Sequence, residues 1–218
     1  MKKYLPFITI IFISFFLIVY LTVQGYQKNG KVRLLPVLGD SEINGTDTAF
    51  HTTLDFHFVN QLGDTITEKD VENKNFVVEY FFTTCQSICP IMNKNMMLVA
   101  KEFENDSEFK ILSHTVIPEE DSIPVLLEYA NDHKANHKNW WFLTGDKKHL
   151  YEIARKSYLM NADEGNGDKD DFIHTQLFVL IDKDRHIRGS YDGTVKADVE
   201  LLISDIHKLK EEQAQNKK

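Results

Sequence analysis

The chain lacks the features that mark several large classes of protein. We find no internal repeat, no phosphate-binding glycine loop and no nucleophile–histidine–acid triad. Positive charge is also scarce, since 25 Lys and Arg residues stand against 33 Asp and Glu residues, giving a formal net charge of −8. That charge argues against nucleic acids and anionic lipid surfaces as the main partners. With only two cysteines in 218 residues, thiol chemistry is confined to one place.

Charge is absent from the N-terminal run Tyr4–Val23, where only a few hydroxyl residues interrupt the apolar content. A helix of about 20 residues spans about 30 Å, the hydrocarbon thickness of a bilayer. The run is longer than the h-region of a cleavable signal peptide, and residues 23–26 are a poor cleavage site. No cysteine follows it that could carry a lipid. The sequence therefore predicts an uncleaved signal-anchor over residues 1–23, forming one transmembrane helix.

The charges that flank this run give its orientation. Lys2 and Lys3 favour a cytoplasmic N-terminus, although Lys28, Lys31 and Arg33 on the far side weaken the argument. We predict a single-pass protein of the cell membrane whose C-terminal domain is extracytoplasmic, in the periplasm. In such a compartment, two thiols can persist as a disulfide.

Behind the anchor, composition divides the chain into a tether and lead-in at 24–50, one domain at 51–212 and a frayed tail at 213–218. Alternating apolar residues predict a hairpin over 54–67, and continuous apolar runs predict buried strands. The predicted strands are 75–83, 109–117, 140–143, 172–182 and 186–191, and the predicted helices are 90–104, 123–133, 146–159 and 195–211. This order predicts an α/β fold with a mixed central sheet flanked by helices and an N-terminal β-hairpin extension.

Both cysteines lie in one short stretch, YFFTTCQSICPIM at residues 80–92. As a structural staple, a Cys85–Cys89 disulfide would close a loop of about five residues, which removes little entropy from the unfolded chain. The pair instead stands between a buried strand and a helix that Pro90 helps to start, where the helix N-terminus can lower thiol pKa values. Because thiolate is both the redox nucleophile and the metal ligand, a redox pair and a metal site both remain open.

Several ordered motifs together resemble the Sco/SenC family of membrane-anchored, thioredoxin-fold copper proteins that serve cytochrome c oxidase assembly. They are VVEYFFTTCQSICPIM at 77–92, PEEDSIPVLLEYA at 118–130, WFLTGDKKHLYEIARKSY at 141–158 and FIHTQLFVLIDKDRHIRGSYDGT at 172–194. The resemblance spans roughly residues 50–210 and implies a thioredoxin-like fold.

The resemblance implies that Cys85, Cys89 and His174 are copper ligands, with one Cu(I) or Cu(II) per domain. Soft thiolates suit Cu(I) and an imidazole also suits Cu(II), so the set can hold both oxidation states. Zinc could use the same residues, and copper is preferred because of the family. The chain departs from the family's usual Asp-Pro pair at Ile117-Pro118.

A missing proline separates metal binding from general thiol exchange. Thioredoxin-fold oxidoreductases usually carry a cis-proline opposite the cysteine pair, but this chain has no proline after Pro124. His174 occupies the corresponding place, which favours a metal site.

Other candidate ligands are better explained by structure. Helical spacing predicts that Met92 and Met96 are core residues, and Met97 is a further thioether that could reach Cu(I). His114 is predicted to be structural and the pair His133 and His137 to be a solvated surface. The acidic loop 161–171 is predicted to be solvated or to face a basic partner, and its carboxylates are Asp163, Glu164, Asp168, Asp170 and Asp171.

These inferences predict a membrane-anchored copper chaperone that assists assembly of the CuA site of cytochrome c oxidase. The predicted partners are the oxidase subunit that carries CuA, a thioredoxin-like reductant and another copper chaperone, with no nucleic acid. Two alternatives use the same residues: a thiol:disulfide oxidoreductase that reduces the oxidase cysteines, with Cys85 and Cys89 as its redox-active pair, and a redox or copper sensor.

Overall fold

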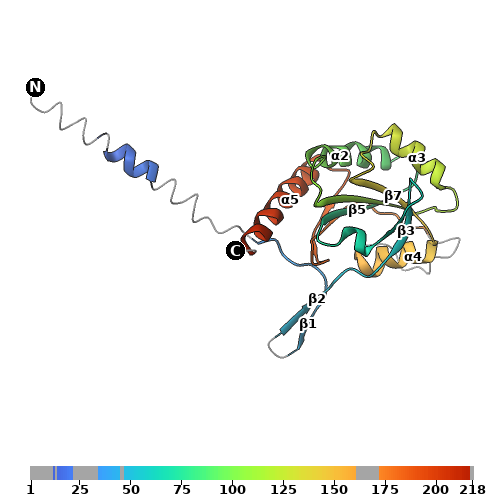
Figure 1. Ribbon diagram of the computed structural model, residues 1–218, viewed down its shortest axis with the longest axis horizontal. Helices are drawn as coiled ribbons and strands as arrows, with labels where there is room; N and C mark the ends of the chain where they lie inside the picture. Colours follow the sequence, from blue (N-terminus) through green and yellow to red (C-terminus); the bar gives the residue numbers. More distant parts are fainter. Residues whose placement is uncertain (1–11, 13, 22–33, 45–46, 161–171, 217–218) are drawn as a thin grey trace, which may run out of the picture. The chain divides into compact units, whose positions relative to one another are not determined.

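A computed structural model describes residues 12, 14–21, 34–44, 47–160 and 172–216 (Figure 1). The chain divides into two compact units, residues 1–33 and 34–218. In the first unit, residues 14–21 are helical, and the predicted span 4–23 lies in large part outside the described residues. Within the described ranges, no helix is both long enough and apolar enough to cross a membrane.

A mixed sheet of seven strands forms the centre of the second unit, in the order β4-β3-β7-β6-β5-β8-β9. Its parallel core is β5, β6 and β7, and the other pairings are antiparallel. Every residue of β5 and β6 is buried, which explains their continuous apolar runs, because helices cover both faces of such strands. The strands are β3 (His57–Asn60), β4 (Thr65–Thr67), β5 (Asn75–Phe81), β6 (Phe109–Thr115), β7 (Trp140–Thr144), β8 (Leu177–Ile181) and β9 (Ile187–Asp192).

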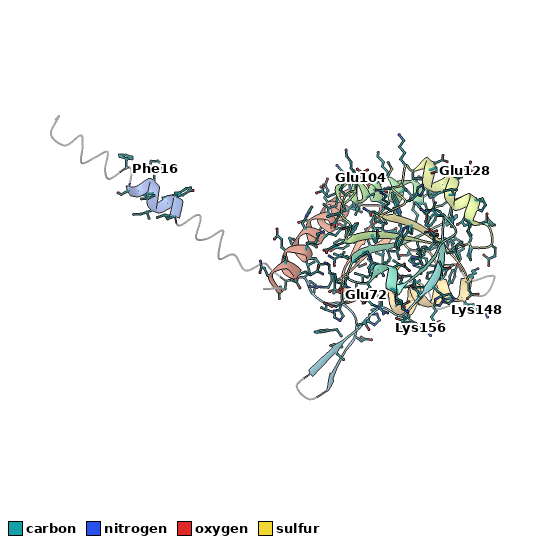
Figure 2. The ribbon with its side chains drawn as sticks, viewed as in Figure 1. Phe16, Glu72, Glu104, Glu128, Lys148 and Lys156 are labelled. Carbon is teal, nitrogen blue, oxygen red and sulfur yellow. The ribbon has the colours of Figure 1, made fainter. Side chains whose placement is uncertain are left out.

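Helices cover the two faces of this sheet unequally (Figure 1). One face packs against α2 (Cys89–Glu102), α3 (Ile123–Asp132) and α5 (Lys196–Asn216). The other packs against α4 (Lys147–Glu152) and the π-helical turn η2 (Ile153–Ser157), and the short 3₁₀-helix η1 (Glu68–Val71) follows β4. Charged side chains such as Glu128 on α3 and Lys148 on α4 lie on the outside (Figure 2). Each face of the sheet therefore has its own apolar core.

This architecture confirms the predicted α/β class, the mixed sheet and the hairpin, which is formed by β3 and β4. The helix predicted at 146–159 is formed by α4 and η2, because a π-turn interrupts its regular α-helical bonds. The predicted strand 172–182 is shorter than expected. Strand β8 begins only at Leu177, which leaves His174 in the preceding loop.

The lead-in segment has more structure than its composition indicated. Strands β1 (Ser41–Asn44) and β2 (Asp47–Phe50) pair in a separate two-stranded sheet, and Leu38 bridges to Ile187 of β9. Helix α5 also continues beyond residue 211 to Asn216. The four-residue strands β1 and β2 show no clear alternation of apolar and polar residues in the sequence.

A buried arginine holds the lead-in against the domain. The Arg188 guanidinium pairs with Asp182 and Glu212 at 2.8 Å each and donates to the carbonyls of Leu35 and Pro36. Leu35 N–H in turn donates to Glu212 at 3.2 Å. Residues 35–36 are thus attached to both β9 and α5.

Candidate metal centre

One pocket of about 160 Å³ gathers both cysteines and His174. It opens at the carboxyl end of β5, where the loop 82–88 leads into α2. Its lining joins that loop to the segment before β8 and comprises Tyr80, Phe81, Phe82, Cys85, Ser87, Ile88, Cys89, Val116, Ile173, His174 and Thr175. No carboxylate is among these lining residues. The available donors are therefore two sulfurs, one imidazole and a few hydroxyl groups.

Cys85 is half-buried in the loop and carries a free thiol. Its sulfur accepts a hydrogen bond from the backbone N–H of Cys89 at 3.4 Å and lies 3.7 Å from the Ser87 hydroxyl. Desolvation acts to raise the pKa of Cys85, but these hydrogen bonds from Cys89 and Ser87 outweigh it and lower the pKa to about 7. A large share of Cys85 is therefore thiolate near neutral pH.

Cys89, the first residue of α2, behaves in the opposite way. It is buried with a free thiol, and burial raises its pKa to about 12, with further contributions from Cys85 and Glu79. The helix N-terminus was predicted to be able to lower thiol pKa values, but it does not do so for Cys89, because desolvation outweighs the helix dipole. The pair consists of one reactive and one protected thiol.

His174 lies at the exposed rim of the pocket. Its ring packs against that of Phe172 at 4.5 Å, and Phe172 packs edge-on against Phe82 at 5.4 Å. In the described part of the chain, the ligand atoms of one group of three acidic or histidine residues all lie within 4.8 Å of one another. That group includes neither His174 nor the two thiols. The structure thus brings the three predicted ligands to one pocket, but their ligand atoms do not all lie within 4.8 Å of one another.

That compact group is formed by Asp182, Asp184 and His186 at the β8–β9 turn. Asp182 already accepts hydrogen bonds from the backbone N–H groups of Asp184 and His186 and pairs with Arg188. These contacts account for the cluster as a turn stabilised by its first carboxylate.

Most of the other candidate ligands in the described residues are buried or already hydrogen-bonded. Met92 and Met96 are fully buried core residues, whereas Met97 is 40% exposed. His114 is buried in the sheet, and His133 and His137 hydrogen-bond to neighbouring groups. The acidic loop 161–171 lies outside the described residues. Ile117 is partly buried against the core next to the pocket.

Two buried carboxylates near the cysteines escaped the sequence analysis. Glu79 of β5 is fully buried; it accepts a hydrogen bond from Ser113 Oγ at 2.6 Å, and burial raises its pKa to about 7. Asp121, which precedes α3, is also fully buried and accepts hydrogen bonds from Thr83 and Thr115. Glu79 left one signal, as the single charged residue within an otherwise apolar strand.

Known proteins resemble this chain in family profile, sequence and structure. The profile of the SCO1/SenC family matches residues 44–211. The SCO1 protein homolog of Bacillus subtilis is 29% identical over 153 residues, which cover 69% of this chain and 79% of that protein.

Solved structures agree with this match. A SCO1/SenC family lipoprotein from Bacillus anthracis has 28% identity and a TM-score of 0.63, over 73% of this chain and 95% of that one. BsSco, described as having a disulfide switch and as a member of the Sco family of cytochrome c oxidase assembly proteins, has 27% identity and a TM-score of 0.62, over 73% and 93%. ScoI of Arabidopsis thaliana, solved with copper bound, shares the fold at 20% identity and a TM-score of 0.58, over 73% and 99%.

Proposed function

The chain belongs to the SCO1/SenC family, and from this premise we propose that it binds copper and assists assembly of the CuA site of a cytochrome c oxidase. Its fold is the α/β thioredoxin-like fold of that family. The observation that carries the proposal is the meeting of two free thiols and an imidazole in one pocket, in a chain of this family.

The donor set fits copper as cargo. Cys85 and Cys89 would hold it as thiolates, and His174 would complete the site. Two soft sulfurs suit Cu(I), and the nitrogen ligand suits Cu(II), which is the harder ion. Because the three ligand atoms do not all lie within 4.8 Å of one another, His174 and the sulfurs would have to approach one another to share one ion.

The thiol pair also supports a redox function. Forming the Cys85–Cys89 disulfide releases two protons and two electrons, which an oxidant such as glutathione disulfide takes up to give two molecules of glutathione. The disulfide would remove both sulfur ligands, so oxidation would block copper binding. The disulfide switch described for BsSco, which is 27% identical to this chain, supports this proposal.

We further propose that residues 1–23 form a single membrane anchor and that the domain at 51–212 lies outside the cytoplasm, reached through 24–50. The uncharged run Tyr4–Val23 supports this proposal. An alkaline phosphatase fused to the C-terminus should be active, since it folds only after export. An inactive phosphatase fusion together with a fluorescent GFP fusion would overturn the orientation.

Metal titration of the full-length chain tests the copper site. The reduced wild type should bind one Cu(II) with a thiolate-to-copper charge-transfer band. Cys85→Ser and Cys89→Ser should each abolish binding of both oxidation states, whereas His174→Ala should lose Cu(II) and retain weakened Cu(I), because two thiolates alone can hold Cu(I). His207→Ala is the matched control, an exposed histidine on α5 that pairs with Glu102.

A second function, thiol:disulfide oxidoreductase, is favoured by the unequal pKa values of the two thiols. An oxidoreductase needs both cysteines but not the imidazole. Oxidase activity in cells carrying His174→Ala separates the two functions. Loss of assembled CuA supports copper delivery, and full activity would leave the oxidoreductase.

A further inference from the structure

The carboxylate of Asp121 is held in a closed set of hydrogen bonds beside the cysteine loop. The residue is fully buried and lies in the turn 117–121, between β6 and α3. Its Oδ1 accepts from Thr83 Oγ1 at 2.5 Å, and its Oδ2 accepts from Thr115 Oγ1. The backbone N–H of Thr83 lies 3.4 Å from both oxygens. A buried carboxylate supplied with donors in this way is a rigid anchor, since losing one of them leaves charge unsatisfied.

The two threonines belong to different parts of the fold. Thr115 is the last residue of β6, within the sheet. Thr83 lies outside the sheet, two residues before Cys85, in the loop that joins β5 to α2. Asp121 therefore ties the start of the cysteine loop to the sheet and to the beginning of α3.

The geometry at Cys85 depends on where that loop starts. The N–H of Cys85 donates to the carbonyl of Phe82 at 3.2 Å, so the turn that presents the thiol spans Thr83. At its other end the Cys85 sulfur accepts from the N–H of Cys89 at 3.4 Å, which α2 holds in place. If Thr83 moves, the sulfur moves relative to the helix.

We propose that Asp121, acting through Thr83, is the positioning residue for Cys85 and sets the separation of the two sulfurs for disulfide formation and copper binding. This inference rests on the proposed function. It also assigns a role to Asp121, the third acidic residue of the PEEDSIP segment at 118–124, which is not among the proposed copper ligands.

The chain offers a matched pair of variants. Thr83→Val and Thr115→Val each remove one hydroxyl donor from the same carboxylate and preserve the side-chain shape. Thr115→Val also removes the acceptor of the Ile117 N–H, which lies at 3.0 Å, so it should destabilise the fold at least as much. Only Thr83→Val releases the cysteine loop.

Three measurements on the full-length chain test the proposal: thermal unfolding, the thiol–disulfide equilibrium against glutathione, and Cu(I) affinity by competition with a chelator. Both variants should unfold at lower temperature. Thr83→Val alone should change the equilibrium constant and weaken Cu(I) binding, each by about tenfold, the usual effect of losing an outer support of a metal ligand. Thr83→Ser, which keeps the hydroxyl, should restore both values and serves as the folded comparison if the valine variant does not fold.

The outcomes separate the two levels of inference. A wild type that binds no Cu(I) and forms no disulfide contradicts the proposed function. A functional wild type whose Thr83→Val and Thr115→Val variants are equal in both site measurements overturns the positioning role, as does a Thr83→Ser variant that restores neither value.

Discussion

Each face of the central sheet buries an ionisable side chain with at least one polar atom that has no hydrogen-bond partner in the described structure. On the face covered by α2, α3 and α5, Glu79 has one oxygen bonded to Ser113 and the other without a partner in the described structure. On the face covered by α4, His114 has no partner for either ring nitrogen there and stacks on Tyr80 at 5.0 Å. Burial raises the pKa of Glu79 to about 7 and lowers that of His114 to about 3.

Burial therefore makes the two faces respond to pH in opposite directions. Glu79 binds its proton more tightly in the folded state, so its contribution to stability is present below pH 4.5 and is lost as pH rises to about 7. His114 releases its proton in the folded state, so its contribution is present above pH 6.5 and is lost as pH falls towards about 3. The Glu79 face also carries the thiol of Cys89, and Glu79 contributes to the raised pKa of that thiol.

A large difference in reactivity is expected between the two thiols of the α2 face. In the reduced, metal-free chain near pH 7, Cys85 should alkylate about 100-fold faster than Cys89, or more, because thiolate is the reacting form. The rate at Cys85 should rise with pH and level off above about 7. Iodoacetamide labelling followed by mass spectrometry measures both rates. Ser87→Ala should shift the Cys85 profile to higher pH, and equal rates at the two thiols would contradict the assignment.

On the α4 face, His114→Leu should remove a loss of stability in acid. Between pH 7 and pH 3.5, the wild type should lose about 4 kcal/mol more unfolding free energy than the variant, since the imidazole gains a proton in the unfolded chain but stays largely neutral in the folded one, a difference of about 1.4 kcal/mol per pH unit. Urea unfolding at each pH gives the two curves. Parallel curves would show that His114 does not titrate as its burial implies.

Glu79→Gln should act at the other end of the pH range. Between pH 4 and pH 8, the wild type should lose about 3 kcal/mol relative to the variant, because only the glutamate must ionise in an apolar site. Glu128→Gln on the exposed side of α3 is the matched control and should follow the wild type. A constant difference between the Glu79→Gln variant and the wild type at every pH would refute the titration.

The smallest effect distinguishes two tyrosines of the α4 face. Tyr158 has a buried hydroxyl without a partner in the described structure, whereas Tyr151 donates to the carbonyl of Val116 at 2.8 Å. Tyr158→Phe should change the free energy of unfolding by less than about 0.5 kcal/mol, and Tyr151→Phe should cost about 1–2 kcal/mol. Chemical unfolding of both variants gives the comparison, and equal costs would place a water or other partner at Tyr158.

Sequence periodicity was sufficient where local pattern and tertiary environment agree. Strands β5 and β6 are continuous apolar runs because both faces are covered, and α2 repeats its core residues at helical spacing with Met92 and Met96 inside. The β1–β2 hairpin was missed because its pairing is not accompanied by a clear alternation. His174 was expected within a strand, but β8 begins three residues later, at Leu177.

The candidate site, too, was only partly predictable from the sequence. Cys85, Cys89 and His174 were identified from motifs and do meet at one pocket. The unequal pKa values of the thiols could not be predicted, because Cys85 and Cys89 are equivalent in the sequence and differ only in burial and hydrogen bonding. Asp121 was part of a recognised motif, yet its connection to Thr83 spans 38 residues of sequence.

By itself, the sequence determined the family, the α/β class and the set of candidate ligand residues, since these depend on residue type and on spacing along the chain. The tertiary structure decided which thiol is buried, that His174 lies at the exposed rim of the pocket, and which buried carboxylate accepts a hydrogen bond from Thr83 in the cysteine loop. The physical reason is that desolvation and hydrogen bonding depend on neighbours in space. Different burial and hydrogen bonding give Cys85 and Cys89 different pKa values. Packing of β5, β6 and α3 brings Asp121 to Thr83.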